Sequence, residues 1–92
     1  DQGVDLIIGK NNETYAVQIK RYTEPVNNSA VQEIASGRMF YNCNYAIVLT
    51  NSTFTTSAIE LANKINVLLW DGEKLLSLLE EYLTARGNVP TI

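Results

Sequence analysis

A nearly continuous apolar run, Tyr45–Thr50 (YAIVLT), restricts the fold of this chain more than any other segment. A short run without alternation is typical of a central strand that is buried on both faces of a parallel sheet. The run Val67–Trp70 (VLLW) has the same character, and a segment with helical spacing of apolar residues separates the two runs. Two parallel strands joined by a helix predict an α/β fold with right-handed crossovers.

The first twenty residues predict an antiparallel hairpin. Strands are expected at Val4–Ile8 and Thr14–Lys20, joined by a polar turn at Lys10–Glu13. Because side chains alternate along a strand, Gln18 and Lys20 lie on one face of the second strand. These two polar residues end a face that is otherwise apolar.

Three later segments predict helices. The expected caps are Asn28 or Ser29 for the first helix and Thr55 or Thr56 for the second, and the third follows the turn at Asp71-Gly72. The apolar positions are Val31, Ile34, Ala35 and Met39 in the first helix, Ile59, Leu61, Ala62 and Ile65 in the second, and Leu75, Leu76, Leu78, Leu79 and Leu83 in the third. Such a sheet requires helices on both faces, so we expect that an N-terminal helix is missing.

The length of 92 residues allows one domain. We expect this domain at residues 1–84, followed by a tail at residues 85–92. The chain starts at Asp1 without an initiator Met, which indicates a fragment of a longer protein. No apolar run reaches the ~18 residues of a membrane span, and no signal peptide is recognisable.

Charge and cysteine content exclude several kinds of site. The single Cys43 cannot form an internal disulfide, and the absence of His excludes a Cys/His zinc site. We expect a half-buried structural thiol and a cytoplasmic protein. The net charge of −3 argues mildly against strong nucleic-acid binding by this chain alone.

Asp5, Gln18 and Lys20 are the candidates for chemistry. A carboxylate on a half-buried strand is costly unless a cation or hydrogen bonds compensate it, and hairpin pairing can bring Asp5 to the side that carries Gln18 and Lys20. The oxygens of Asp5 and Gln18 and the carbonyl of Ile19 suit Mg²⁺, which prefers oxygen ligands. The ammonium of Lys20 could orient a water and stabilise charge on a phosphate.

A purely structural interpretation also fits this pattern. Asp5 and Lys20 could form a cross-strand ion pair, and Gln18 could be a solvated strand residue. Similarly, a group of polar residues after the buried strand could contact phosphate or only cap a helix and shape a loop. This group is Asn51, Ser52, Thr53 and Thr55.

A resemblance that covers nearly the whole chain favours the chemical interpretation. The stretches GVDLII, YAVQIKRY, AVQEIASGRMFYNCNYAIVLTNSTFTTSAIELA and VLLWDGEKL resemble the catalytic domain of Mrr-type restriction endonucleases, from Asp1 to about Leu76. That family belongs to the PD-(D/E)xK nuclease superfamily. The resemblance implies a restriction-endonuclease-like core, in which helices flank a mixed four-stranded sheet, and Mg²⁺-dependent hydrolysis of phosphodiester bonds, with Mn²⁺ as an alternative metal.

The resemblance also assigns roles to single residues. Asp5 corresponds to the metal-binding aspartate, and Gln18 and Lys20 correspond to the motif at the end of the sheet, with Gln18 in place of the second acidic ligand. Gln32 resembles a polar position on the following helix that faces the active site. Asp1 matches an acidic position before the glycine. Relatives often carry a supporting glutamate on an upstream helix, which this sequence does not include.

The leading hypothesis is therefore an endonuclease domain of a prokaryotic or phage protein that cleaves double-stranded DNA. We expect a separate domain for DNA recognition in the parent protein and a homodimer, because two cuts in a duplex need two active sites. One alternative is a non-catalytic DNA-binding or assembly module that keeps the nuclease fold. Another is a junction-resolving nuclease.

Overall fold

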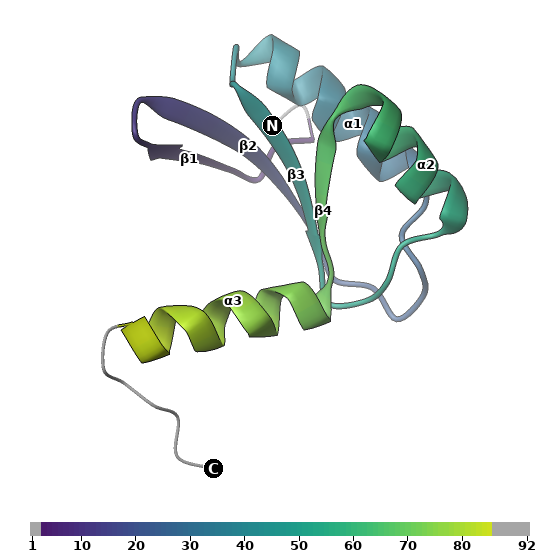
Figure 1. The fold of residues 1–92 in the computed structure, drawn as a ribbon. Helices are drawn as coiled ribbons and strands as arrows, with labels where there is room; N and C mark the ends of the chain where they lie inside the picture. Colours follow the sequence, from purple (N-terminus) through teal and green to yellow (C-terminus); the bar gives the residue numbers. More distant parts are fainter. Residues whose placement is uncertain (1–2, 86–92) are drawn as a thin grey trace.

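The computed structural model describes residues 3–85, which form one four-stranded sheet and three helices (Figure 1). The elements are β1 (Leu6–Lys10), β2 (Glu13–Lys20), α1 (Asn28–Phe40), β3 (Tyr45–Thr50), α2 (Thr56–Ile65), β4 (Val67–Trp70) and α3 (Gly72–Ala85). This order confirms the α/β fold predicted from the apolar runs. The tail expected at residues 85–92 lies outside the described residues, except that Ala85 ends α3.

The sheet has the strand order β1-β2-β3-β4. β1 and β2 pair antiparallel, whereas β2, β3 and β4 are parallel. The strand β3, built from the run YAIVLT, lies between two parallel neighbours, as its apolar sequence predicts. Ala46, Ile47, Val48 and Thr50 of this strand are buried.

The hairpin differs from its predicted position. β1 was expected at Val4–Ile8, but it starts at Leu6 and continues to Lys10, which pairs with Glu13. The turn therefore contains only Asn11 and Asn12, which both have positive φ, at 54° and 66°. Asparagine tolerates the left-handed conformation that a two-residue hairpin turn requires, so the strands can extend to the turn. Asp5 precedes β1 and is exposed instead of lying within the strand.

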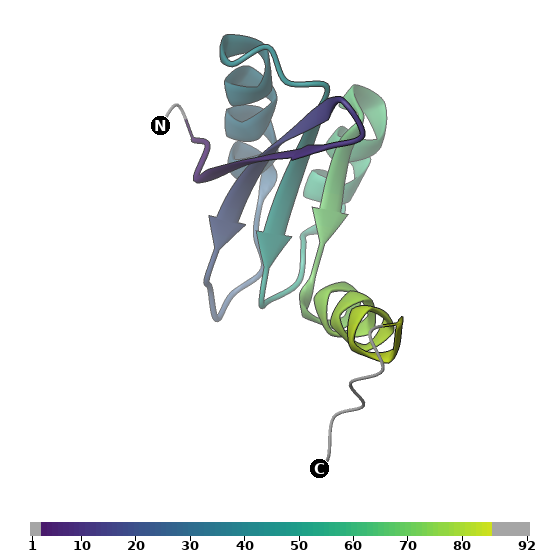
Figure 2. The same cartoon turned by 90° about the vertical axis from the view of Figure 1, so that its left-hand side faces the viewer.

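Helices α1 and α2 pack on the same face of the sheet, as Figure 2 also shows. The buried core between these helices and the sheet contains small and branched side chains from both layers, including Ala16, Ala30, Val31, Ile34, Ala46, Val48, Ala58, Ala62 and Val67. Cys43 also belongs to this core and is more deeply buried than predicted. Met39, which was expected to be an apolar contact of the first helix, is 71% exposed.

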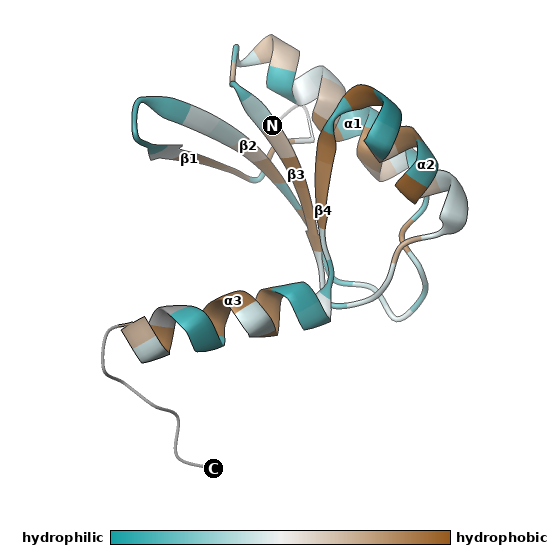
Figure 3. Ribbon diagram, viewed as in Figure 1, coloured by the Kyte–Doolittle hydropathy of each residue, from teal (hydrophilic) through white to brown (hydrophobic). Residues whose placement is uncertain are grey.

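Helix α3 occupies a different position. It extends from the carboxyl end of β4 toward the side of the sheet to which the hairpin curls, and it contacts chiefly β4 (Figures 1 and 2). Brown and teal residues alternate along it in Figure 3, and Leu75, Leu76 and Leu79 are more than 40% exposed. The packing role predicted for these three leucines is therefore wrong for the described residues. None of the helices within residues 3–85 has the length and apolar character that a membrane crossing requires.

The helix ends show which side chains act as caps. Asn27, one residue before the predicted caps, is the N-cap of α1, and its side chain accepts a hydrogen bond from the Ser29 amide at 3.0 Å. The helix starts here because Val26 is still extended and pairs with the segment around Phe54. Thr55 caps α2 as predicted, since its hydroxyl oxygen accepts a bond from the Ala58 amide at 3.1 Å.

At the amino ends of β2 and β3, side-chain hydrogen bonds support the register of these two strands. The Asn44 side chain accepts a bond from the Thr14 amide at 2.8 Å, and the Tyr45 hydroxyl donates to Glu13 Oε2 at 2.8 Å. This bond to the Glu13 carboxylate, together with the charge of that carboxylate, raises the pKa of Tyr45. The same register places Gln18 beside Val48 and Lys20 beside Thr50 at the carboxyl ends of the strands.

Candidate active site

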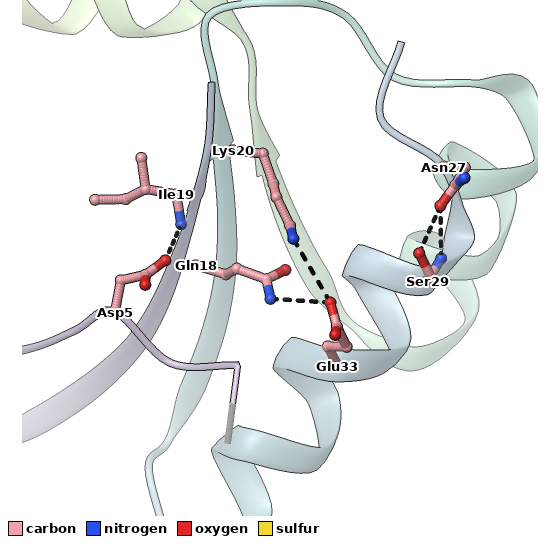
Figure 4. Close-up of polar contacts among 7 residues, drawn as sticks. All are labelled: Asp5, Gln18, Ile19, Lys20, Asn27, Ser29 and Glu33. Atoms are coloured by element: carbon pink, nitrogen blue, oxygen red, sulfur yellow. Dashed lines mark hydrogen bonds and ion pairs between the residues drawn. The ribbon is translucent and has the colours of Figure 1, made fainter. Parts of the chain in front are cut away.

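Gln18 and Lys20 meet at one carboxylate of the neighbouring helix. Gln18 Nε2 donates a hydrogen bond to Glu33 Oε1 at 3.2 Å, and Lys20 Nζ lies 3.7 Å from the same oxygen. Figure 4 shows both side chains pointing from β2 toward Glu33 on α1. The alternation of β2 explains why both reach the same helix, because residues two apart share one face of a strand. The expectation that Gln18 and Lys20 share a face is confirmed.

The second polar atom of Gln18 has no partner among the described residues. The side chain is 4% exposed, and its Oε1 is buried without a hydrogen bond. Leaving a buried acceptor unsatisfied costs roughly 1–3 kcal/mol. A solvated strand residue, the structural alternative for Gln18, would not have these properties. The oxygen therefore lacks the partner that a buried acceptor normally has.

Asp5 approaches β2 by a different route from the one predicted. It lies in the bend before β1, and its Oδ2 accepts a hydrogen bond from the backbone amide of Ile19 at 2.7 Å (Figure 4). The amide of Asp5 also donates to the carbonyl of Val17 at 2.9 Å. The exposed carboxylate thus does not carry the burial cost inferred from the sequence. The backbone bonds still hold Asp5 next to the strand that carries Gln18 and Lys20.

Lys20 pairs with Glu33 and not with Asp5 within residues 3–85. The alternative of a cross-strand ion pair between Asp5 and Lys20 is therefore wrong for this structure. The ammonium of Lys20 also lies 5.7 Å from the centre of the Tyr22 ring, a cation–π distance. The Lys20 side chain is 23% exposed, so it remains accessible to a bound molecule.

Two predicted site positions remain, Gln32 and Asp1. Gln32 is an exposed residue of α1 and makes no side-chain hydrogen bond among the described residues; it lines a shallow pocket of about 430 Å³ with Gly3 and Glu33. The adjacent residue, Glu33, makes the contacts to the sheet. Asp1 lies outside the described residues.

The polar residues of the loop after β3 form hydrogen bonds within the protein. Asn51 Oδ1 accepts a bond from the Tyr22 amide at 3.0 Å, and the Ser52 hydroxyl donates to the Glu24 carbonyl at 2.9 Å. The carbonyl of Thr53 accepts a bond from the Val26 amide, and Thr55 is the α2 cap. These bonds favour the structural alternative, in which the loop residues join the loop after β2 to the loop after β3.

Sequence reasoning missed two residues of this site, Glu33 and Gly3. Glu33 is not among the candidate residues named from the sequence, but its carboxylate contacts Gln18 and Lys20 of the sheet. Gly3 has a φ of +77°, and a Cβ there would lie 3.2 Å from Gln18 Nε2 and 3.2 Å from Glu33 Cβ. The need for a counter-ion to Lys20 on the helix that covers its face was the signal for Glu33. Nothing in the sequence indicates the close approach of Gly3.

The chemistry of this site depends on oxygen donors and one ammonium. No cluster of three or more His, Cys, Asp or Glu side chains suited to a metal occurs among residues 3–85. The donors are the Asp5 carboxylate, Gln18 Oε1 and the Ile19 carbonyl; the carbonyl points to the same strand edge as the Ile19 amide, because both groups of a strand residue point the same way. Such oxygens suit Mg²⁺ or Mn²⁺ better than softer metals.

A pocket of about 620 Å³ lies elsewhere and contains none of the predicted site residues. It is lined by Arg38, Asn44, Asn63 and Asn66 together with residues that start β3 and β4. In open α/β sheets, ligands bind outside the carboxyl ends of the strands. The group around Lys20 lies at that end, and the pocket lies at the opposite one.

A comparison with known protein families identifies the family of this chain. The family model that matches residues 1–79 is Mrr_cat, which describes a restriction endonuclease. The chain belongs to the Mrr_cat restriction endonuclease family. The resemblance noted in the sequence is thereby confirmed, together with the α/β fold that it implied.

Solved structures agree on the fold of the restriction endonuclease domain. The DNA modification-dependent restriction endonuclease AspBHI matches with a TM-score of 0.65 and 19% identity over 89% of this chain and 22% of that chain. A crystal structure of a protein of unknown function matches with a TM-score of 0.65 and 16% identity over 74% of this chain and 40% of that chain. This chain therefore spans less than half of either neighbour. No curated protein sequence matches it.

Proposed function

We propose that this domain is a Mg²⁺-dependent endonuclease that hydrolyses phosphodiester bonds of double-stranded DNA, with Mn²⁺ as an alternative metal. The observation that carries the proposal is the buried, unpartnered Oε1 of Gln18, on the strand that carries Lys20 and whose Ile19 amide binds Asp5. A buried oxygen without a donor is unfavourable unless a cation, a water or another donor satisfies it. Membership of the restriction endonuclease family supplies the class of reaction.

The residues present fit a hard divalent cation. Asp5, Gln18 Oε1 and the Ile19 carbonyl would hold it, and the bond from the Ile19 amide to Asp5 Oδ2 keeps the carboxylate at this edge of β2. When bound, the metal would supply a Lewis acid for the phosphate and lower the pKa of a coordinated water. With a single carboxylate among these donors, we expect weak metal binding that is completed by DNA phosphate.

Lys20 would act on the nucleophile and on the phosphate. Its ammonium has three donors, and the side chain is partly exposed at the carboxyl end of β2. In this position it can orient the attacking water and stabilise the negative charge that develops on the phosphate oxygens. Glu33 balances this charge in the absence of DNA.

Partners are proposed on the basis of charge and substrate geometry. The net charge of −3 supports a separate DNA-recognition domain in the parent protein, because this chain offers few cations for phosphate contacts. Cleavage of both strands supports a homodimer. Cytoplasmic restriction of foreign DNA in a prokaryote, or a corresponding phage function, is the setting we propose.

Cleavage of supercoiled plasmid by the chain in Mg²⁺ or Mn²⁺ tests this function. We expect nicking that disappears with EDTA and falls on the order of 100-fold or more in Lys20→Ala, the usual effect of losing a group that stabilises transition-state charge. The matched control is Lys64→Ala, which removes the same charge from an exposed position of α2 and should cut at the wild-type rate.

Two other outcomes of the cleavage assay would favour the alternative functions. A folded chain that binds DNA but does not cut it in either metal would contradict the endonuclease proposal and support the binding or assembly module. Cleavage restricted to branched DNA, with linear and supercoiled duplexes uncut, would support the junction-resolving alternative.

A further inference from the structure

We infer that Glu33 is a positioning residue, which fixes the amide of Gln18 so that Oε1 is presented as a ligand and holds Lys20 beside it. The inference rests on the proposed function, since it assigns Oε1 to the metal named there. Glu33 itself is not assigned to the metal. Its task is to determine which of the two polar atoms of Gln18 is free.

The chemistry of the Gln18–Glu33 contact allows only one orientation of the Gln18 amide. An ionised carboxylate only accepts hydrogen bonds, and in a glutamine side chain only Nε2 donates. The contact at 3.2 Å therefore has one arrangement, with Nε2 toward Glu33 Oε1. Because the amide is planar, this places Oε1 on the other branch of the group. A neutral partner such as glutamine or serine at position 33 would allow either orientation.

Because the Gln18 amide is buried, reversing its orientation is energetically costly. Gln18 is 4% exposed, and its Oε1 has no partner among the described residues. If the amide turned by 180°, the carbonyl oxygen would face the Glu33 carboxylate and both groups would be acceptors. The Gly3 backbone also packs close to this nitrogen, since a Cβ at position 3 would be 3.2 Å from Gln18 Nε2. The nitrogen is thus enclosed between the Gly3 backbone and Glu33.

The same carboxylate oxygen also positions Lys20. Its ammonium lies 3.7 Å from Glu33 Oε1, so Gln18 and Lys20 share a single acceptor (Figure 4). Glu33 is 53% exposed, and solvent screening makes such a pair weak as a source of stability. Its effect is therefore geometric, in that it keeps the ammonium on the side of β2 where Gln18 lies. A water or phosphate held by Lys20 would then lie near the metal ligands.

The orientation can be measured without metal or DNA. In NMR spectra of the labelled chain, the Gln18 side-chain amide protons should show contacts to the Glu33 side chain and to Gly3. Glu33→Ala should abolish the contacts to residue 33 and release the amide from its fixed orientation. Glu60→Ala, at an exposed position of α2, is the control and should leave the Gln18 signals unchanged. Wild-type spectra without these contacts would overturn the inference, whether or not the chain is a nuclease.

A charge exchange tests the link to the metal. In Glu33→Gln the new amide can donate to Gln18 Oε1 and compete with a cation, so we expect Mn²⁺ affinity, measured by electron paramagnetic resonance, to fall about 10-fold. The double variant Gln18→Glu/Glu33→Gln restores a donor–acceptor pair with reversed polarity and places a carboxylate at position 18. It should bind Mn²⁺ at least as well as wild type. Unchanged affinity in Glu33→Gln, or no recovery in the folded double variant, would overturn the inference.

These two measurements separate the inference from the proposed function. A wild-type chain that neither binds Mn²⁺ nor cuts DNA refutes the proposed function and the ligand role of Oε1 together. A chain that binds Mn²⁺ and cuts DNA while Glu33→Gln behaves as wild type refutes only the role of Glu33. Folding of each variant is checked by urea unfolding, so that loss of structure is not read as loss of binding.

Discussion

Gly3 illustrates how one residue shapes the candidate site. Its φ of +77° lies in the left-handed region, and its backbone packs against Gln18 and Glu33. A side chain there would meet both strain and contact, since left-handed conformations cost L-residues roughly 1–2 kcal/mol. The absence of a Cβ is therefore required by the geometry around Gln18.

We predict that Gly3→Ala lowers the free energy of unfolding by about 1–2 kcal/mol through backbone strain and also weakens metal binding by displacing the Gln18 amide. Urea unfolding and Mn²⁺ titration are the measurements. Gly9→Ala is the matched control, because a Cβ at Gly9 would meet only the Glu13 carbonyl at 4.0 Å. Equal effects of the two substitutions would contradict the prediction.

Asparagine supplies the other described positions with positive φ: Asn11, Asn12, Asn42 and Asn66. Within the hairpin turn, Asn12 has a φ of 66°. Glycine reaches this region without steric cost, and Asn-Gly is the preferred pair for such a turn.

Asn12→Gly should therefore stabilise the chain by about 0.5 kcal/mol, as judged from the favoured turn type. The same substitution at Asn63, inside α2, should destabilise it by up to about 1 kcal/mol because glycine disfavours helix. Thermal and urea unfolding of the two variants compare them directly. A loss of stability in Asn12→Gly would show that the Asn12 side chain contributes more than its backbone conformation.

At the scale of elements, the start of α1 determines where Glu33 stands relative to the sheet. Asn27 accepts bonds from the Ser29 amide and hydroxyl, at 3.0 and 2.7 Å. Val26, just before it, bonds to the segment at Thr53 and Thr55. The helix start is thus attached to the loop before α2, and Glu33 lies on the second turn of α1.

Asn27→Ala should lower the free energy of unfolding by about 1 kcal/mol, the usual value of an N-cap. Because the first turn frays, we also expect weaker Gln18–Glu33 contacts in the NMR spectrum. The control is Asn28→Ala, the neighbouring asparagine, which makes no cap bond in the described residues. A stability change at Asn28 equal to that at Asn27 would contradict the assignment of the cap.

At the scale of the whole molecule, one cluster joins the sheet to both helices on its covered face. Ile34 is 0% exposed and is among the largest of the fully buried side chains. It lies on α1 next to Glu33, with its side chain in the core, whereas the Glu33 carboxylate contacts Gln18 and Lys20. The packing of this helix therefore supports both the stability of the fold and the geometry of the site.

Ile34→Ala should cost about 2–5 kcal/mol, the range for large-to-small changes in a core. Since small domains have a total stability of only about 5–15 kcal/mol, the variant should unfold at much lower urea concentration. Met39→Ala on the same helix removes a similar volume from a side chain that is 71% exposed and should change stability little. Similar unfolding midpoints for the two variants would contradict the placement of the core.

Local sequence patterns were sufficient for the layout of the fold. The apolar runs at β3 and β4, the alternation of β2 and the cap at Thr55 are properties of short segments, so they could be predicted without tertiary information. Strand patterns also made Asp5, Gln18 and Lys20 candidates for the site, family resemblance added Gln32, and the roles of all four remain predictions. The positions that failed, such as the ends of β1, depended on turn chemistry.

Only the tertiary structure decided which groups meet. The packing of α1 on the sheet brings Glu33 into contact with Gln18 and Lys20. Gln18 and Glu33, which share a hydrogen bond, are 15 residues apart in sequence. The approach of Gly3 and the bond from the Ile19 amide to Asp5 likewise depend on how the chain enters β1. Sequence periodicity determines which face a residue occupies, but the distance between two faces is determined by the packing of whole elements, which no local pattern encodes.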